Sequence, residues 1–385
     1  MKNRSKGICV MKALKLWNWI ISFLFIVTFA ACSTESGGGT LSLSLSDATT
    51  DEYNAVYVTI EEVQVREGED RRWKVVTFPD KTYNLLELVN GVREQMGITE
   101  LQTGHYTQMR LMIGDDPDNG INVLSESHEY ANYIIDHNDD YQALKIPSGL
   151  QTGIKIVHGF DINEGQTTEL ILDFDASRSI VKAGSSGKWL LKPTIKVLDT
   201  EEYSVISGTV KNSDQEPLRG VLVSAQISAS GAADEKEKVV VQASTVTDEN
   251  GSYTIFLESD TYNIVGYKNN YNPGCARIET VSGTTYTENF ILSAASTGTM
   301  KGEVRIDGGD YENYVTVSIR QSAGCGDNID QIEVKSINVA NGGDYDISLP
   351  VATYTVVASS YGEDTQVDDD VEIMADSATI TDIVF

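Results

Sequence analysis

Apolar and polar residues alternate along much of this chain with a period of two. Leucines and serines alternate from Leu41 to Ser46, and apolar residues recur in the same way from Val56 to Val65. A period of two places successive side chains on opposite faces of a β-strand, so both segments are predicted strands. In the second segment the apolar positions change parity at Glu61-Glu62, which predicts a β-bulge at these two residues.

Strand signals also dominate the rest of the N-terminal half. Val, Ile, Thr and Tyr lie between Gly, Asn and Asp breaks, which predicts further strands at residues 73–78, 106–113, 142–146, 153–162, 168–174 and 188–198. Residues 84–97 are the best candidate for a short helix. Residues 115–141 form an insertion rich in Asp, Asn and Tyr, which we expect to be polar and exposed.

The C-terminal half contains an internal repeat. Gly251-Ser252-Tyr253 returns as Gly343-Asp344-Tyr345, and Gly208-Thr209-Val210 returns as Gly302-Glu303-Val304. Two modules of about 90 residues, at 204–294 and 297–385, therefore follow a first domain at 40–200. Period-two segments between turns predict a seven-stranded sandwich in each module.

The module at 204–294 resembles the carboxypeptidase regulatory-like (transthyretin-like) sandwiches of bacterial surface proteins. It carries their T-D-x-x-G-x-Y pattern at Thr247–Tyr253, in which the Asp and Gly form a turn and the Tyr enters the core. The module at 297–385 keeps Gly343 and Tyr345 and has Ala340 in place of the acid. The resemblance implies modules that act as spacers or docking surfaces, without a catalytic peptidase domain.

The first domain resembles the DUF4382 family of bacterial lipoproteins. The resemblance rests on several segments in order: Leu43–Ala48, Val56–Ile60, Gly104–Leu111, Ile146–Gly149, Gly153–Lys155, Asp173–Ala176 and Leu191–Pro193. It implies a β-sandwich-like, surface-anchored domain and no particular activity. The predicted fold is therefore all-β, with three consecutive β-sandwich (Ig/transthyretin-like) domains after a signal peptide.

The N-terminus predicts export and lipidation. Residues 1–31 contain five cations and no acid, and the apolar run Leu16–Ala31 is too short for a typical membrane span. Phe29-Ala30-Ala31-Cys32 resembles the lipobox of bacterial lipoproteins, with Phe29 in place of the usual Leu. The resemblance implies a signal peptide at 1–31, a lipidated Cys32 and a flexible tether at 32–39. An ordinary secretory signal is the alternative, and Met11 is an alternative start.

Charge narrows the classes of partner. The chain has 29 Lys and Arg residues against 57 Asp and Glu residues, a net charge of −28. Nucleic-acid binding needs clustered cations, so a nucleic-acid partner is not expected. The expected partners are the membrane, through the lipid anchor, and an unidentified protein or glycan. The expected location is the outer membrane of a Gram-negative bacterium, facing the periplasm or the cell surface.

Two groups of carboxylates are candidate metal ligands. Asp173 and Asp175 point to one face of a predicted strand, and the alternative is that they cap the following turn and pair with Arg178 or Arg110. The second group, Asp115, Asp116 and Asp118, lies in the polar insertion and lacks the distal Glu of an EF-hand. No cofactor is expected, and calcium is the open alternative. No catalytic residue is assigned, because the sequence shows neither paired histidines nor a G-x-S-x-G motif.

Aromatic residues and cysteines complete the candidates. Tyr130, Tyr133 and Tyr141 lie in the insertion and are candidates for stacking on sugar rings. Trp73 and Trp189 are interpreted as core or half-buried residues. The order of strands in a seven-stranded sandwich places Cys275 and Cys325 at facing ends of the two modules, which predicts a disulfide between the modules.

These observations favour a non-enzymatic binding or interaction protein that is anchored to a membrane. The alternative is a carbohydrate-binding accessory lipoprotein that uses the insertion tyrosines. An enzyme is the least favoured reading, because it requires a carboxylate pair to be catalytic. The ligand, the oligomeric state, and the face of the outer membrane that displays the chain are left open.

Overall fold

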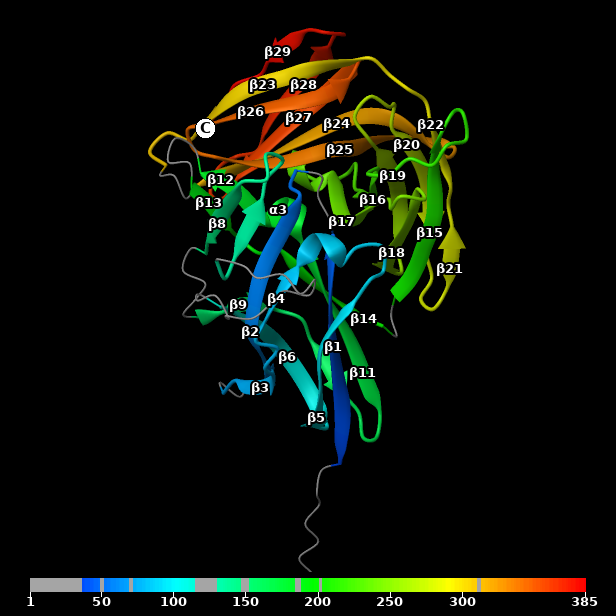
Figure 1. The fold of residues 1–385 in the computed structure, drawn as a ribbon. Coiled ribbons are helices and arrows are strands. Elements are labelled where there is room, and N and C mark those ends of the chain that lie inside the picture. Colours follow the sequence, from blue (N-terminus) through cyan, green and yellow to red (C-terminus); the bar gives the residue numbers. More distant parts are fainter. Residues whose placement is uncertain are drawn as a thin grey trace, which may run out of the picture. The chain divides into compact units, whose positions relative to one another are not determined.

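A computed structural model describes residues 37–48, 52–68, 72–114, 130–146, 152–183, 188–200, 203–309 and 313–385. Strands make up most of the described chain, and its helical segments are single turns: η1 (Leu85–Glu87), α3 (Ala176–Ser179) and η2 (Glu235–Glu237). In these ranges no helix has the length and apolar character needed to cross a membrane. The prediction of an all-β chain is confirmed (Figure 1).

The first domain contains two sheets. One has the order β14-β11-β1-β5 and the other the order β10-β6-β2-β7-β8-β13-β12, with β3, β4 and β9 paired at its sides. The strands are β1 (Gly38–Ala48), β2 (Ala55–Glu67), β3 (Lys74–Thr77), β4 (Lys81–Asn84), β5 (Glu94–Gln102), β6 (Gly104–Ile113), β7 (Tyr133–Ile135), β8 (Tyr141–Lys145), β9 (Ile154–Ile156), β10 (Phe160–Ile162), β11 (Thr167–Asp175), β12 (Ile180–Ala183), β13 (Lys188–Leu191) and β14 (Ile195–Asp199).

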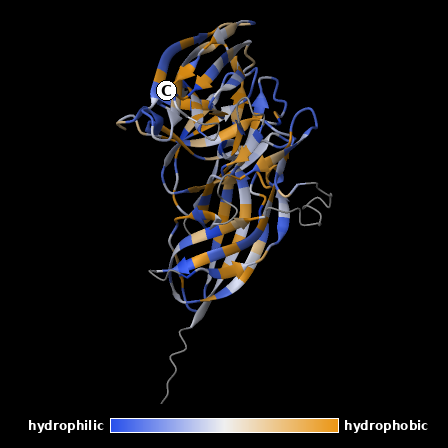
Figure 2. Ribbon diagram, turned by 90° about the vertical axis from the view of Figure 1, so that its left-hand side faces the viewer, coloured by the Kyte–Doolittle hydropathy of each residue, from blue (hydrophilic) through white to orange (hydrophobic). Residues whose placement is uncertain are grey.

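The period-two pattern explains the core of this domain. Leu41, Leu43 and Leu45 point inward from β1, and each is at most 1% exposed. The pairing of β2 with β6 changes register between Ile60 and Glu62, so the predicted bulge is confirmed. The alternation of apolar and polar residues along the strands is visible in Figure 2.

The predicted helix at residues 84–97 is wrong. This segment contains only the turn η1, and residues 94–97 already belong to β5. The apolar spacing that suggested a helix buries Leu85 and Leu88 from this single turn. Asn90 and Gly91 then take positive φ angles of 58° and 80°, which an α-helix does not allow, and the chain enters β5.

The two C-terminal modules follow the first domain and are called the second module (204–294) and the third module (297–385). They share one strand order. The second module consists of β15 (Tyr203–Asn212), β16 (Leu222–Ser228), β17 (Val239–Val246), β18 (Ser252–Glu258), β19 (Thr261–Tyr267), β20 (Gly274–Glu279), β21 (Thr285–Thr287) and β22 (Phe290–Leu292). The third consists of β23 (Thr297–Arg305), β24 (Tyr314–Cys325), β25 (Asn328–Ala340), β26 (Gly343–Pro350), β27 (Ala352–Ser360), β28 (Gln366–Ile373), β29 (Ala378–Ile380) and β30 (Ile383–Val384). Each module has eight strands instead of the expected seven, because its last strand is interrupted.

The repeated Gly and Tyr residues explain this interruption. Gly208 lies opposite Tyr253, and Gly302 lies opposite Tyr345 in the third module. At each glycine the last strand bends inward, so an added Cβ would lie 1.6 Å from the Glu288 carbonyl oxygen in the second module. The Tyr253 hydroxyl donates to that same oxygen at 2.8 Å. The glycine therefore leaves room for the backbone at the break in the last strand, and the tyrosine hydroxyl hydrogen-bonds to it.

The first domain and the third module share a sheet. Strand β12 pairs with β25 in parallel at Lys182 and Val339, which joins the second sheet of the first domain to β25-β24-β27-β28. Residues 38–385 form one compact unit. This junction was not predicted, because a single pair between strands far apart in sequence leaves no periodic signal.

Candidate functional site

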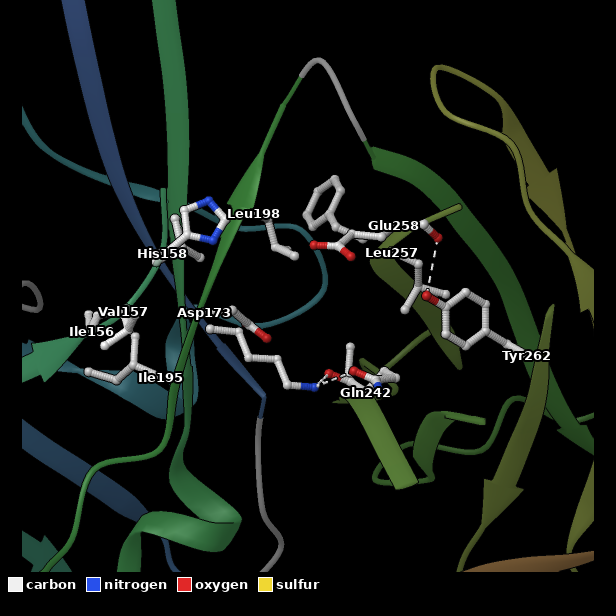
Figure 3. A pocket seen from close by; sticks show the side chains of 14 residues that line it. Ile156, Val157, His158, Asp173, Ile195, Leu198, Gln242, Leu257, Glu258 and Tyr262 are labelled. Atoms are coloured by element: carbon white, nitrogen blue, oxygen red, sulfur yellow. Dashed lines mark hydrogen bonds between the residues drawn. The ribbon is translucent and has the colours of Figure 1, made fainter. Parts of the chain in front are cut away.

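The predicted carboxylate Asp173 lines a pocket between the first domain and the second module (Figure 3). The pocket has a volume of about 270 Å³ and is lined by residues of β11, β14, β17, β18 and β19. Strands β14 and β18 are edge strands of their sheets, so the pocket lies between two sheet edges. Ionisable side chains reach it from both domains, namely Asp173, Lys196, His158 and Glu258.

Lys196 links the two walls of this pocket. It lies opposite Asp173 in the β11–β14 ladder, and its ammonium group donates to the carbonyl oxygen and the side-chain oxygen of Gln242 in the second module. Burial lowers the pKa of Lys196 to about 8. The Asp173 carboxylate accepts a hydrogen bond from the Ser46 hydroxyl at 2.9 Å. These charged groups therefore act mainly as contacts between and within domains.

A second carboxyl group lies behind the pocket. Asp47 is 4% exposed, and its Oδ1 accepts from the Ala176 backbone N–H at 3.0 Å, whereas its Oδ2 has no hydrogen-bond partner in the described part of the chain. Burial raises the pKa of Asp47 well above its usual value, with a further increase from the charges of Asp173 and Asp175. Burial likewise raises the pKa of Asp173 to about 6. The folded protein therefore binds protons here more tightly than the unfolded chain.

Replacing Asp173 with asparagine is expected to stabilise the protein at neutral pH. A carboxyl whose pKa rises from 3.8 to about 6 on folding contributes stability that is complete below about pH 4 and lost as the pH rises through 6. After allowance for solvent and for the lost charge opposite Lys196, Asp173→Asn should add about 1–2 kcal/mol to the free energy of unfolding at pH 7.5. Urea unfolding at pH 7.5 and pH 4 measures this difference.

The gain should vanish near pH 4, where the native carboxyl is protonated. Asp214→Asn, at an exposed loop position, is the control and should show no gain at either pH. Equal stability of Asp173→Asn and the native chain at both pH values would contradict the assigned proton affinity of Asp173.

Asp175 has the structural role that the sequence analysis weighed against metal binding. Its Oδ1 accepts from the Arg178 backbone N–H at 3.1 Å and from the Ser177 hydroxyl at 2.6 Å, so it caps α3. The Arg178 side chain lies 3.7 Å from Asp175 Oδ2. Within the described ranges no group of three or more His, Cys, Asp or Glu residues is arranged to hold a metal ion. Asp115, Asp116 and Asp118 lie outside these ranges.

The insertion tyrosines do not form one exposed surface. Tyr133 is 2% exposed and stacks on Tyr57 with ring centroids 4.5 Å apart, so its prediction as an exposed sugar platform is wrong. Its backbone belongs to β7, inside the sheet, which buries the ring against β2. Tyr141 is 54% exposed and stacks on Tyr133 at 5.7 Å, and Tyr130 is 37% exposed. Tyr141 and Tyr130 are therefore the accessible members.

Both tryptophans are half-buried, as interpreted from the sequence, and cations approach their rings. Lys182 lies 5.2 Å from the Trp189 ring centroid, and Tyr53 packs against Trp189 edge-on at 5.7 Å. Arg110 and Arg66 lie 4.5 and 5.6 Å from the Trp73 ring centroid. Because cations occupy these rings, neither tryptophan offers a free platform for a neutral sugar.

A buried junction around Glu333 joins all three domains, and no sequence pattern predicted it. The Glu333 carboxylate lies 3.3 Å from the Arg178 guanidinium of the first domain. Its backbone N–H and C=O bind both polar atoms of the Gln226 side chain, from the second module, at 2.9 and 2.6 Å. The one available signal was a lone arginine, Arg320, in the otherwise uncharged strand β24.

Arg320 extends this junction into the second module. It is 1% exposed, and its guanidinium donates to the carbonyl oxygens of Glu235 at 2.8 Å, Lys236 at 3.2 Å and Val239 at 3.3 Å. Ser318 connects Arg320 to Glu333, at 2.9 and 2.5 Å respectively. Glu333 therefore lies between two guanidinium groups that belong to different domains.

A disulfide also joins the second and third modules. Cys275 in β20 and Cys325 at the end of β24 are bonded, with Cα atoms 4.8 Å apart. Arg277, two residues after Cys275, forms an ion pair at 2.9 Å with Asp330, five residues after Cys325. The bond closes a loop that spans the linker between the modules, which restricts the unfolded chain and so favours the folded one.

Comparison with family models agrees with the two resemblances. Residues 38–193 match a domain of unknown function (DUF4382), and residues 205–293 match the carboxypeptidase regulatory-like domain. The order of these families along the chain, as named from the sequence, is confirmed. Neither family description names a catalytic activity.

Three individual proteins are similar to parts of this chain, at low coverage or low structural similarity. Structural protein 27 of a virus (isolate Australia/Victoria) is 32% identical over 108 residues, which span 28% of this chain and 17% of the viral protein. The Bacillus anthracis TIE protein matches 91% of this chain and 51% of its own at 14% identity and a TM-score of 0.20. A streptococcal ancillary pilin matches 89% of this chain and 99% of its own at 10% identity and a TM-score of 0.21. TM-scores this low do not establish a common arrangement of domains.

Proposed function

We propose that this protein is a lipid-anchored, non-enzymatic interaction module. Cys32 carries the anchor, the tether 32–39 follows it, and the folded body acts in the outer membrane, toward the periplasm or the cell surface. The N-terminal signal features and the resemblance to a lipoprotein family support this location. Asp173 and Lys196, two of the ionisable residues of the pocket, are hydrogen-bonded to neighbouring residues, which is consistent with binding rather than turnover.

The Glu333 junction is the observation that carries the proposal. Side chains from all three domains meet at this buried carboxylate, and a disulfide joins two of the domains. A chain joined in this way keeps its outer faces in fixed positions relative to one another. Fixed faces reduce the ordering cost of binding, which suits a protein whose role is to present surfaces to a partner.

A glycan-array screen and cross-linking on intact cells test the proposed function. The purified mature chain would be screened with calcium and with a chelator, and the anchored protein would be cross-linked to its neighbours. Saturable binding to a glycan class, or a specific cross-linked partner, is the expected result. Substrate turnover that is lost on Asp173→Asn would contradict the non-enzymatic proposal.

Carbohydrate binding through the insertion is the second candidate. Tyr141 favours it, because its exposed ring is held in place by stacking on buried Tyr133. An exposed and preoriented aromatic ring is a suitable stacking surface for a sugar. Loss of glycan binding on Tyr141→Ala, with normal folding, would support this candidate, whereas unchanged binding would exclude this ring.

Replacing Cys32 with serine is expected to release the protein from membranes completely. Several acyl chains contribute about 0.8 kcal/mol per buried CH2 group, and a hydroxyl at this position cannot form the thioether that carries them. Membrane fractionation measures the release of the protein, and incorporation of radiolabelled palmitate measures its lipidation. Cys275→Ser is the control for loss of a cysteine and should remain labelled. Membrane retention and labelling of Cys32→Ser would contradict the proposed anchor.

A further inference from the structure

Three cations lie together on the outer face of the first domain. Arg110 of β6 lies opposite Gln64 of β2 on one side and opposite Lys155 of β9 on the other, and Arg66 of β2 lies opposite Gln108. Residues directly opposite one another in a sheet share a face. We call Arg66, Arg110, Lys155 and the adjoining Trp73 the cationic face.

The sheet register places these side chains outside the core. The residues that alternate with them are the core residues Val63, Val65, Met109 and Leu111, each at most 1% exposed. Lys155 is exposed, and Arg66, Arg110 and Trp73 are half-buried. The cationic face is therefore open to solvent along three neighbouring strands.

Trp73 and Gln64 hold the two arginines in place. The Arg110 guanidinium lies 4.5 Å from the Trp73 ring centroid and its Nε donates to Gln64 Oε1 at 2.6 Å. Another Arg110 nitrogen donates to the Thr152 carbonyl oxygen at 3.3 Å. The Arg66 guanidinium lies 5.6 Å from the same ring. Such contacts orient both guanidinium groups before any ligand binds.

No carboxylate of the described residues forms an ion pair with these three cations. The nearest acid on this face by register, Glu62, instead accepts a hydrogen bond from Gln64. Several cations elsewhere are paired with acids, for example Arg277 with Asp330, Lys301 with Asp346 and Lys335 with Glu52, at 2.5–2.9 Å. The chain has about twice as many acids as bases, yet none of the described acids pairs with this group of cations.

Two features of the cationic face lower the stability of the folded protein. Arg110 and Lys155 are like charges directly opposite each other in the ladder, which destabilises a sheet. In addition, Arg66 Nε and Gln108 Oε1, from one cross-strand pair, are buried atoms without a hydrogen-bond partner among the described residues. A ligand that supplies negative charge, hydrogen-bond acceptors and hydrogen-bond donors would offset both costs once these side chains turn toward it.

The chemistry of the face selects among anionic ligands. Guanidinium groups bind carboxylates and sulfates with two parallel hydrogen bonds, and sugar hydroxyls supply the donors that Gln108 lacks. Adjacent strands are about 4.8 Å apart, so the face from β2 to β9 spans about 10 Å, more than a single anionic group covers.

We propose that the cationic face binds an anionic polysaccharide that carries carboxylate or sulfate groups at regular intervals. This proposal rests on the proposed function, because it names the ligand class and the surface of a binding module. It differs from the tyrosine candidate in both the site and the charge of the sugar. Trp73 serves here to orient arginines and does not stack on the ligand.

Calorimetric titration of the full-length chain in nonionic detergent tests the proposal. The probes are polygalacturonate for carboxylates, dextran sulfate for sulfates, and uncharged dextran as the neutral control. Poly-glutamate and phosphatidylglycerol vesicles represent an acidic peptide and an anionic membrane. The native chain should bind at least one of the two charged polysaccharides, with affinity that falls as salt increases, and should not bind dextran.

Two variants connect this binding to the face. Lys155→Glu changes an exposed residue, and Arg110→Gln removes a fork of donors, so each should weaken binding by about tenfold or more. Arg219→Glu, an exposed arginine paired with Glu249 in the second module, is the matched control and should leave binding unchanged. Thermal unfolding of each variant verifies that it folds, and Lys155→Glu preserves the test if Arg110→Gln does not fold.

The proposal would be overturned if the folded chain bound neither charged polysaccharide, or if Lys155→Glu and Arg219→Glu had the same effect. Equal or tighter binding of poly-glutamate or of the vesicles would also overturn it, in favour of those partners. A glycan or protein partner found on the array or on cells, and unaffected by Lys155→Glu, would leave the interaction function standing and exclude only this site.

Discussion

Replacing Glu333 with glutamine is expected to destabilise the protein by about 3 kcal/mol, because it removes the negative charge that lies between buried Arg320 and half-buried Arg178. Glu333 is 9% exposed and Arg320 is 1% exposed, so water cannot replace the lost charge. Glutamine keeps the backbone hydrogen bonds to Gln226, so the change isolates the contribution of the charge. Urea denaturation followed by circular dichroism measures the loss.

Glu249→Gln is the matched control for this prediction. Glu249 pairs with Arg219 at 3.2 Å, but both side chains are more than 70% exposed. Exposed pairs contribute little, so this variant should change the free energy of unfolding by less than about 0.5 kcal/mol. If Glu333→Gln were no less stable than Glu249→Gln, the junction would not depend on its buried charge.

Gly208→Ala is expected to unfold the second module or to cost it about 3 kcal/mol or more. An added Cβ would lie 1.6 Å from the Glu288 carbonyl oxygen and 2.9 Å from the Tyr253 ring. The obstacle is backbone, so the last strand would have to move and its pairing with β15 would be disrupted. Thermal unfolding and limited proteolysis of the second module report this loss.

Gly231→Ala provides the control, because an added Cβ at Gly231 meets no atom within 4 Å. Its stability should remain within about 0.5 kcal/mol of the native chain. Gly302→Ala should repeat the Gly208 result in the third module, where the added Cβ would lie 2.0 Å from the Thr381 carbonyl oxygen. Normal folding of Gly208→Ala would show that the repeated glycine is not required for the strand break.

The sequence predicted the features that depend on local pattern. The bulge at Glu61-Glu62 follows from one change of parity, and the repeated Gly and Tyr residues correspond to one strand register in both modules. The helix prediction at residues 84–97 is wrong, because the apolar spacing of one turn resembles a helix but Asn90 and Gly91 end it with positive φ angles.

The sequence pattern does not predict contacts between domains. Glu333 and Arg178 are 155 positions apart, and nothing in their neighbouring residues indicates that they meet. The cationic face was missed for the same reason, because Arg66, Arg110 and Lys155 come together only through the register of β2, β6 and β9. Tyr133 was misjudged because the polar composition of its insertion concealed the short strand β7.

Differential scanning calorimetry of the oxidised chain shows whether the domains form one body that presents fixed faces. We expect the second and third modules to unfold in a single transition, and Glu333→Gln together with reduction of the Cys275–Cys325 bond to separate it into two. Two independent transitions in the native oxidised chain, at temperatures that Glu333→Gln leaves unchanged, would show that the modules are not joined into one body.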